Sequence, residues 1–357
     1  RARRRVYRPS ARYVARRGRR QVALAATWQA WIFQPVSHTV RAAALVGVAL
    51  LLGCVLRSGR PAAPTPELYG AGLFSTGAWD FFMAFSPDER EVLFCRANDD
   101  FSRYQIYETH RDESGGWSRP APAAFAGEWS NADPHFTPDG RTVFFISDRP
   151  APRETKAQST YDIWFVTRDS SGSWGAAQRL PASVSVPGVD EWSPSIAANG
   201  SLYFGTERPG GHGAMDLWMA RLVDGVYQAP VNLGDSINTA GNEVEPWVAP
   251  DERYLIFSGK TRSDSVGGYD LYLSRRERGV WQRAQRLDHG VSSAWSDFNQ
   301  SVSPDGKWLY FSSTRPYGGT IVPRSDTLPV VGAANGVGNG KGDIYRIALR
   351  DLGVAPH

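Results

Sequence analysis

The sequence is poor in the residues that build most catalytic and metal centres. It contains two cysteines, Cys54 and Cys95, and its six histidines are scattered without His-x-His or His-x-x-x-His spacing. It also lacks a Gly-x-Ser-x-Gly turn, a phosphate-binding P-loop and a Cys-x-x-Cys pair. Because no motif indicates a serine hydrolase, a P-loop enzyme or a thiol redox centre, we expect no cofactor and favour a non-enzymatic role.

Long amphipathic helical patterns are missing from residues 66–357. Turn residues are abundant instead, with 36 glycines and 24 prolines. Apolar residues make up 41% of the chain and aromatic residues 12%, which is enough for a sizeable core. This composition favours an all-β fold made of many short strands.

Acidic residues are absent from residues 1–53, which contain 11 arginines and no lysine. The remainder of the chain therefore carries 40 − 11 = 29 basic residues against all 36 acidic ones, a balance of −7. The positive net charge lies outside the folded part, so a nucleic-acid partner is excluded.

The longest apolar run of the N-terminal region, residues 42–52, is too short to span a bilayer but has the length of a signal-peptide core. It ends in Leu51-Leu52-Gly53-Cys54, which resembles the bacterial lipobox. The resemblance implies cleavage before Cys54 and lipidation of that cysteine; a plain secretory signal or a chance apolar run is the alternative. We expect residues 1–53 to be an over-extended basic N-terminus plus a signal peptide, and residues 54–66 to be the lipidated cysteine and a proline-rich tether.

One unit recurs five times along the rest of the chain. Its turn is clearest as Ser303-Pro304-Asp305-Gly306, and the five turn positions are 87, 138, 198, 250 and 304, with spacings of 51, 60, 52 and 54. Each unit holds four strand-like segments, as a propeller blade requires. We predict an all-β, five-bladed β-propeller with four-stranded blades over residues 67–350 and a tail at 351–357; a sixth, degenerate blade is the alternative.

The fifth unit ends after its third strand-like segment, near Leu349. A spare strand-like segment, residues 67–74, precedes the first unit. We predict that this N-terminal segment supplies the missing fourth strand and closes the ring.

The repeats resemble the WD40-like (TolB-type) propeller repeat, whose signature is Ser-Pro-Asp-Gly, an aromatic strand, Ser-x-Arg and Asp-Ile-Tyr. The fifth unit shows all of it, with Ser313-Thr314-Arg315 and Asp343-Ile344-Tyr345 after its turn. The resemblance implies a propeller of the bacterial envelope that binds a protein or a glycan. With the lipobox, it predicts a lipid-anchored monomer on the periplasmic side of the outer membrane or at the cell surface.

A polar residue lies seven positions before each turn and should ring one mouth of the central channel, because the first strand of a blade lines that channel. These residues are Asp80, Asn131, Glu191, Glu243 and Asp297. Asp133 and Glu245 lie two residues further on and should face the same side, and Trp192 and Trp247 are neighbouring aromatic candidates. The acids either bind a ligand or a cation at the mouth, or accept hydrogen bonds that staple neighbouring blades.

Residues that recur in nearly every unit are expected to be architectural, because an active site needs asymmetry. They are the arginines at 96, 149, 208, 262 and 315 and the aspartates at 162, 216, 270 and 343. The non-repeated inserts, near residues 150–160, 209–214 and 316–342, are better functional candidates.

Three functions remain open at this point. The leading one is a non-catalytic, envelope-anchored propeller that binds a protein or a glycan. The second is a glycoside hydrolase that uses two of the acids Asp80, Glu191, Glu243 and Asp297. The third is a purely structural subunit of an envelope complex.

Overall fold

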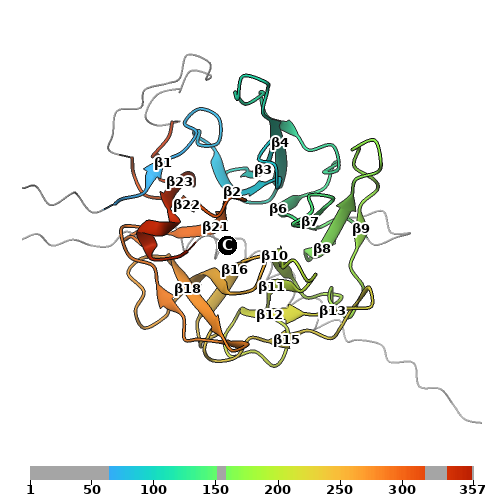
Figure 1. Cartoon of the computed structure of the whole chain (residues 1–357), viewed down its shortest axis with the longest axis vertical. Helices are drawn as coiled ribbons and strands as arrows, with labels where there is room; N and C mark the ends of the chain where they lie inside the picture. Colours follow the sequence, from blue (N-terminus) through green and yellow to red (C-terminus); the bar gives the residue numbers. More distant parts are fainter. Residues whose placement is uncertain (1–63, 151–157, 318–335, 356–357) are drawn as a thin grey trace, which may run out of the picture. The chain divides into compact units, whose positions relative to one another are not determined.

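The computed structural model describes residues 64–150, 158–317 and 336–355. Its strands form five antiparallel sheets that follow one another around a common centre (Figure 1). The chain is a five-bladed β-propeller with four-stranded blades, as the repeats predict, and the described residues form no sixth blade. Residues 1–53, Cys54 and most of the tether lie outside the described residues.

The blades are built in chain order, each from its innermost strand outward. The first contains β2 (Trp79–Phe85), β3 (Glu91–Ala97), β4 (Tyr104–His110) and β5 (Ala121–Pro122). The second contains β6 (Asn131–Phe136), β7 (Thr142–Ser147), β8 (Asp162–Thr167) and β9 (Gln178–Arg179). The third contains β10 (Glu191–Ile196), β11 (Leu202–Thr206), β12 (Asp216–Ala220) and β15 (Val231–Asn232). The hairpin of β13 (Leu222–Val223) and β14 (Val226–Tyr227) extends beyond it.

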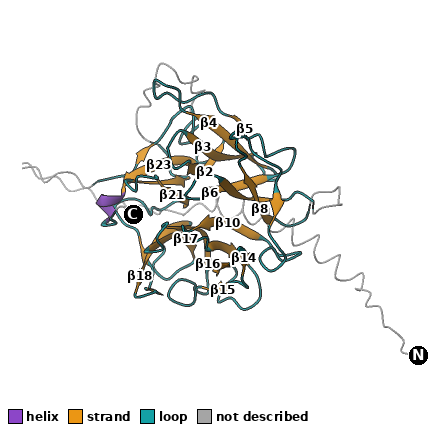
Figure 2. Cartoon of the chain, turned by 45° about the vertical axis from the view of Figure 1, so that its right-hand side comes forward, coloured by secondary structure: helices purple, strands orange, loops and turns teal. Residues whose placement is uncertain are grey.

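The fourth blade contains β16 (Asn242–Val248), β17 (Tyr254–Lys260), β18 (Tyr269–Glu277) and β20 (Gln285–Arg286), and β19 (Val280–Trp281) also pairs with β18. The fifth contains β21 (Asp297–Val302), β22 (Trp308–Ser313), β23 (Asp343–Ala348) and β1 (Glu67–Leu68). The short helix η1 (Leu349–Leu352) follows, drawn in purple in Figure 2. None of the helices in the described residues is long and apolar enough to cross a membrane.

The predicted ring closure is confirmed, since β1 pairs with β23 and places Glu67 opposite Arg346. The closing strand is shorter than the predicted segment 67–74. Gly70 and Gly72 have φ of 60° and 82°, so the chain leaves the extended conformation and turns toward the first blade. Phe74 ends this turn fully buried.

The core lies between successive blades, because the second strand of each blade is apolar on both faces. All seven residues of β17 are buried. One cluster joins Tyr203 of the third blade to Phe257 of the fourth, and another joins Ile256 of the fourth to Phe311 of the fifth. Sheet-to-sheet packing of this kind holds each blade to its neighbour.

The two faces of the propeller carry different connections. At one face, which we call the turn face, the first strand turns into the second through the repeated turns at positions 87, 138, 198, 250 and 304. At the other, the loop face, the second strand connects to the third; in the second blade Asn131, Ser147 and Asp162 lie side by side there. The insert at 209–214 connects β11 to β12 at the loop face. Residues 151–157 and 318–335 of the two other inserts lie outside the described residues.

Two of the repeated turns carry glutamate where the others carry glycine. Glu89 and Glu252 have φ of 56° and 57°, close to the 68° of Gly140 and Gly306. The turn geometry is therefore retained, and each glutamate adopts a left-handed conformation that costs roughly 1–2 kcal/mol.

Candidate functional site

The five polar residues predicted at the channel mouth are the first or second residues of the inner strands at the loop face, and each is completely buried. Each one also contacts the repeated arginine of its own blade. The guanidinium nitrogens lie 2.5 Å from Asp80 (Arg96), 3.1 Å from Glu191 (Arg208), 2.9 Å from Glu243 (Arg262) and 2.5 Å from Asp297 (Arg315). In the second blade Arg149 donates to Asn131 Oδ1 at 2.7 Å.

Three of these acids also accept hydrogen bonds from the backbone of the segment that precedes their inner strand. The backbone N–H of Thr76 donates to Asp80 at 2.7 Å, that of Thr239 to Glu243 at 2.8 Å and that of Ser293 to Asp297 at 2.7 Å. These hydrogen bonds and ion pairs use the carboxylate oxygens inside each blade. Asp80, Glu243 and Asp297 are therefore engaged by the fold and poorly placed to take a ligand.

Glu191 differs from the other acids of this set. Its Oε1 accepts from Arg208 and from the Val186 N–H, whereas its buried Oε2 has no partner within the described residues. Burial raises the pKa of Glu191 to about 8, and Arg208 only partly offsets that shift. Its burial therefore favours the protonated form more than the surroundings of an exposed glutamate would.

In every inner strand the residue two positions after the polar mouth residue has a left-handed backbone, although none of these residues is glycine. The residues are Phe82, Asp133, Ser193, Glu245 and Asn299, with φ of 53°, 55°, 50°, 56° and 50°. The strand register shifts at the same point in every blade, so each inner strand has a bulge there. The backbone conformation is the same in all five blades, but the side chains at this position differ, so this ring of residues makes the channel asymmetric. The sequence pattern did not predict the conformation.

Asp133 and Glu245 are the two carboxylates of this ring. Ser193 donates to Asp133 at 2.6 Å, and Ser258 and the Asn299 N–H donate to Glu245, both at 2.7 Å. Burial raises the pKa of Asp133 to about 6. Burial likewise raises the pKa of Glu245 to about 7, and the charge of Asp133 adds to that shift. The second and fourth blades thus place two proton-holding carboxyls within electrostatic reach of each other.

A buried lysine of the fourth blade adds to the asymmetry of this region. Lys260 is 9% exposed, ends β17 at the loop face and lies over the ring of Tyr269 at 5.3 Å. Burial lowers the pKa of Lys260 to about 8. The equivalent positions in the other blades hold Ala97, Asp148, Glu207 and Thr314, a difference that comparison of the repeats could have revealed.

The structure separates the two tryptophans proposed for the channel mouth. Trp192 packs on Tyr161 with ring centroids 5.0 Å apart, near the loop face. Trp247 is 7% exposed and lines a different pocket of about 190 Å³, together with the turn prolines Pro87, Pro138, Pro250 and Pro304. Trp247 lies four residues after Glu243 along β16, so it is roughly 13 Å closer to the turn face.

No protein-family model matches the chain, and no curated protein matches its sequence. Among solved structures it is similar to a putative TolB from Agrobacterium tumefaciens, with 17% identity over 75% of this chain and 89% of that one and a TM-score of 0.44. It is also similar to the catalytic domain of a GH62 α-L-arabinofuranosidase from Coprinopsis cinerea, with 11% identity over 81% and 98% of the two chains and a TM-score of 0.45. A gluconolactonase from Xanthomonas campestris shows 12% identity over 83% and 100% and a TM-score of 0.43. Similarities this distant add nothing to the functional argument.

The raised pKa of Glu245 makes a prediction about stability. Between about pH 4.5 and 7 the folded chain keeps a proton on Glu245 that the unfolded chain has lost, so stability should fall as pH rises through this window. Glu245→Gln removes this titration, and its free energy of unfolding relative to wild type should rise by about 1 to 3 kcal/mol from pH 4.5 to pH 8. Urea unfolding at several pH values measures the difference.

Asp139→Asn is the matched control. The Thr137 hydroxyl lowers the pKa of Asp139. The stability that the Asp139 carboxylate contributes is therefore lost only as pH falls below the usual titration range of an aspartate. Its stability difference from wild type should stay constant between pH 5 and 8. A constant difference for Glu245→Gln over the same range would contradict the assignment.

Proposed function

We propose that the chain is a non-catalytic binding propeller of the bacterial envelope, anchored through lipidated Cys54, that holds a protein or glycan partner on its loop face. The observation that carries this proposal is a division between two sets of polar residues. The repeated acids and arginines are paired inside the blades, whereas Asp133, Glu245 and Lys260, which do not repeat, lie in the channel or at the loop face.

An exposed tryptophan supports the loop face as the binding surface. Trp295 is 46% exposed, and the Gly268 N–H donates to its carbonyl at 2.9 Å, which ties the segment to the loop that contains Val266. Val266 is itself 50% exposed. Tryptophan is enriched where proteins bind partners, and its ring also stacks on sugars, so this patch suits either class of ligand.

Site-specific photo-crosslinking tests the position of the binding surface. A photoreactive amino acid replacing Trp295 should give defined adducts in envelope preparations or with purified envelope glycans. The control is the same residue at Val280, which is 63% exposed and lies in the hairpin between β18 and β19. Equal adduct yields at the two positions, or none at Trp295, would contradict the proposal.

Lipid anchoring has a separate test. The wild-type chain, expressed in a Gram-negative bacterium, should incorporate a palmitate analogue and fractionate with membranes, and Cys54→Ser should abolish both because the thioether cannot form. Cys95→Ala is the matched control, since Cys95 is completely buried in β3. Labelling that persists in the Cys54 variant would exclude the anchor.

A glycoside hydrolase is the second candidate, favoured by one observation. Asp133 and Glu245 are buried carboxyls whose pKa values of about 6 and 7 suit proton transfer near neutral pH. This pair replaces the acids Asp80, Glu243 and Asp297 as the place to look, because those three are engaged by arginines and backbone amides.

Assays with aryl glycosides distinguish the two candidates. A binding propeller should release no aryl alcohol at any pH between 4 and 8. Hydrolysis by the wild-type chain, lost by at least a hundredfold in both Asp133→Asn and Glu245→Gln, would establish the hydrolase.

A further inference from the structure

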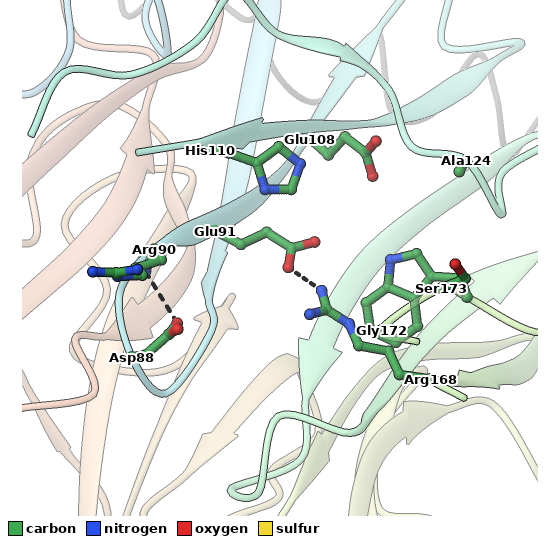
Figure 3. A pocket seen from close by; sticks show the side chains of 10 residues that line it. Asp88, Arg90, Glu91, Glu108, His110, Ala124, Arg168, Gly172 and Ser173 are labelled. Carbon is green, nitrogen blue, oxygen red and sulfur yellow. Dashed lines mark hydrogen bonds and ion pairs between the residues drawn. The ribbon is translucent and has the colours of Figure 1, made fainter. Parts of the chain in front are cut away.

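A second polar cluster lies between the first and second blades, toward the turn face and apart from the channel. Glu91, Glu108, His110, Arg168 and Trp174 line a pocket of about 420 Å³ there. Figure 3 shows the side chains of Glu91, Glu108 and His110 on one side of this pocket and that of Arg168 across from them. One ligand-capable atom from each of Glu91, Glu108 and His110 lies within 4.8 Å of the others.

Strand register brings the three side chains together. Glu91 begins β3 and pairs directly with His110, which ends β4. Glu108 is two residues before His110, so it projects from the same face of the sheet. The arrangement therefore rests on two paired strands and does not depend on a loop.

Glu91 is the buried member of the cluster and has one unpartnered oxygen. Its side chain is 5% exposed, and Arg168 pairs with Oε2. Oε1 is buried in the pocket and has no hydrogen-bond partner within the described residues. Buried polar groups are normally hydrogen-bonded, and a bound ion or water is a recognised explanation for one that is not. Glu91 differs from the other buried acids with an unpartnered oxygen in having a second carboxylate and an imidazole beside it.

The cluster is found in one blade. The corresponding three positions hold Thr142, Phe165 and Thr167 in the second blade, Leu202, Trp218 and Ala220 in the third, Tyr254, Leu273 and Arg275 in the fourth, and Trp308, Arg346 and Ala348 in the fifth. None of these twelve residues is a histidine, cysteine or carboxylate. The propeller architecture therefore does not require ligating residues at this place.

Arg168, by contrast, belongs to the repeated architecture. It lies 4.1 Å from the ring centroid of Trp174, as Arg111 lies 4.5 Å from Trp117 and Arg276 lies 5.5 Å from Trp281. The positive charge of Arg168 balances one of the two carboxylates. When Glu91 and Glu108 are both ionised, the cluster therefore has a net negative charge. A cation is therefore favoured over an anion.

We propose that Glu91, Glu108 and His110 bind one divalent transition-metal ion of the Zn²⁺ class. Imidazole and carboxylate ligands suit such an ion, whereas Ca²⁺ takes six to eight oxygen ligands that this cluster does not supply. Three protein ligands leave a coordination position directed toward the pocket, where water or an anionic group can bind. The site lies on the flank of the propeller and does not depend on the function proposed for the loop face.

Metal titration of the full chain without an affinity tag tests the site. Isothermal titration with ZnCl₂ should show one tight site per chain, and Co²⁺ should give a visible absorption band. His110→Asn and Glu108→Gln should each weaken the Zn²⁺ affinity at least tenfold. His212→Asn is the matched control, because His212 is exposed and lies on another blade, and its affinity should equal that of the wild type.

A thermal measurement separates metal binding from loss of folding. Without metal, His110→Asn should melt close to the wild-type temperature; Zn²⁺ should raise the melting temperature of the wild type and of His212→Asn only. Wild-type protein that binds no Zn²⁺, or an equal affinity in His110→Asn, would overturn the proposal.

Discussion

The pairing of β1 with β23 is the constraint on which the rest of the propeller depends. Because both ends of the described chain share one sheet, strand pairing holds the last blade to the segment that leads into the first, in addition to the face-to-face packing of neighbouring blades. Glu67 and Leu68 supply the outermost strand of the blade that ends with Asp343–Ala348. This closure keeps each blade packed between two neighbours, so that the inner strands converge and the loops gather at one face.

The buried acids of the ring fall into two groups, those that are paired with an arginine and those that are not. A buried carboxylate is stable when it is paired and fully hydrogen-bonded, and Asp80 and Asp297 reach that state through an arginine of their own blade and the N–H groups of the incoming connection. Asp133 and Glu245 lie two residues after Asn131 and Glu243 and have no arginine partner among the described residues, so they keep their protons to a higher pH. The strand β16 thus carries both kinds of acid: Glu243 is paired with Arg262 inside the blade, whereas Glu245 is bound by a serine and a backbone N–H of other strands.

Asymmetry is the property that the two proposals share. A residue that recurs in every blade stabilises the blade structure, whereas a single ligand site needs residues that differ from blade to blade. Trp295 on the loop face and the Glu91, Glu108 and His110 cluster on the flank are both departures from the repeat. They lie at opposite ends of the blades, which leaves room for a partner on one face and an ion between two blades.

The blade count, the turn positions and the closure of the ring could all be predicted from the amino-acid sequence. These features depend on local patterns, such as Ser303-Pro304-Asp305-Gly306 and the incomplete fifth unit, which repeat often enough to be read along the chain. Which acids are paired with an arginine followed only from the tertiary structure. The contact of Asp80 with Arg96 depends on strand register, and that of Glu91 with Arg168 depends on packing between blades. It also decided the left-handed bulge at Asp133 and Glu245, since no residue preference marks that conformation and only the pairing of neighbouring strands imposes it.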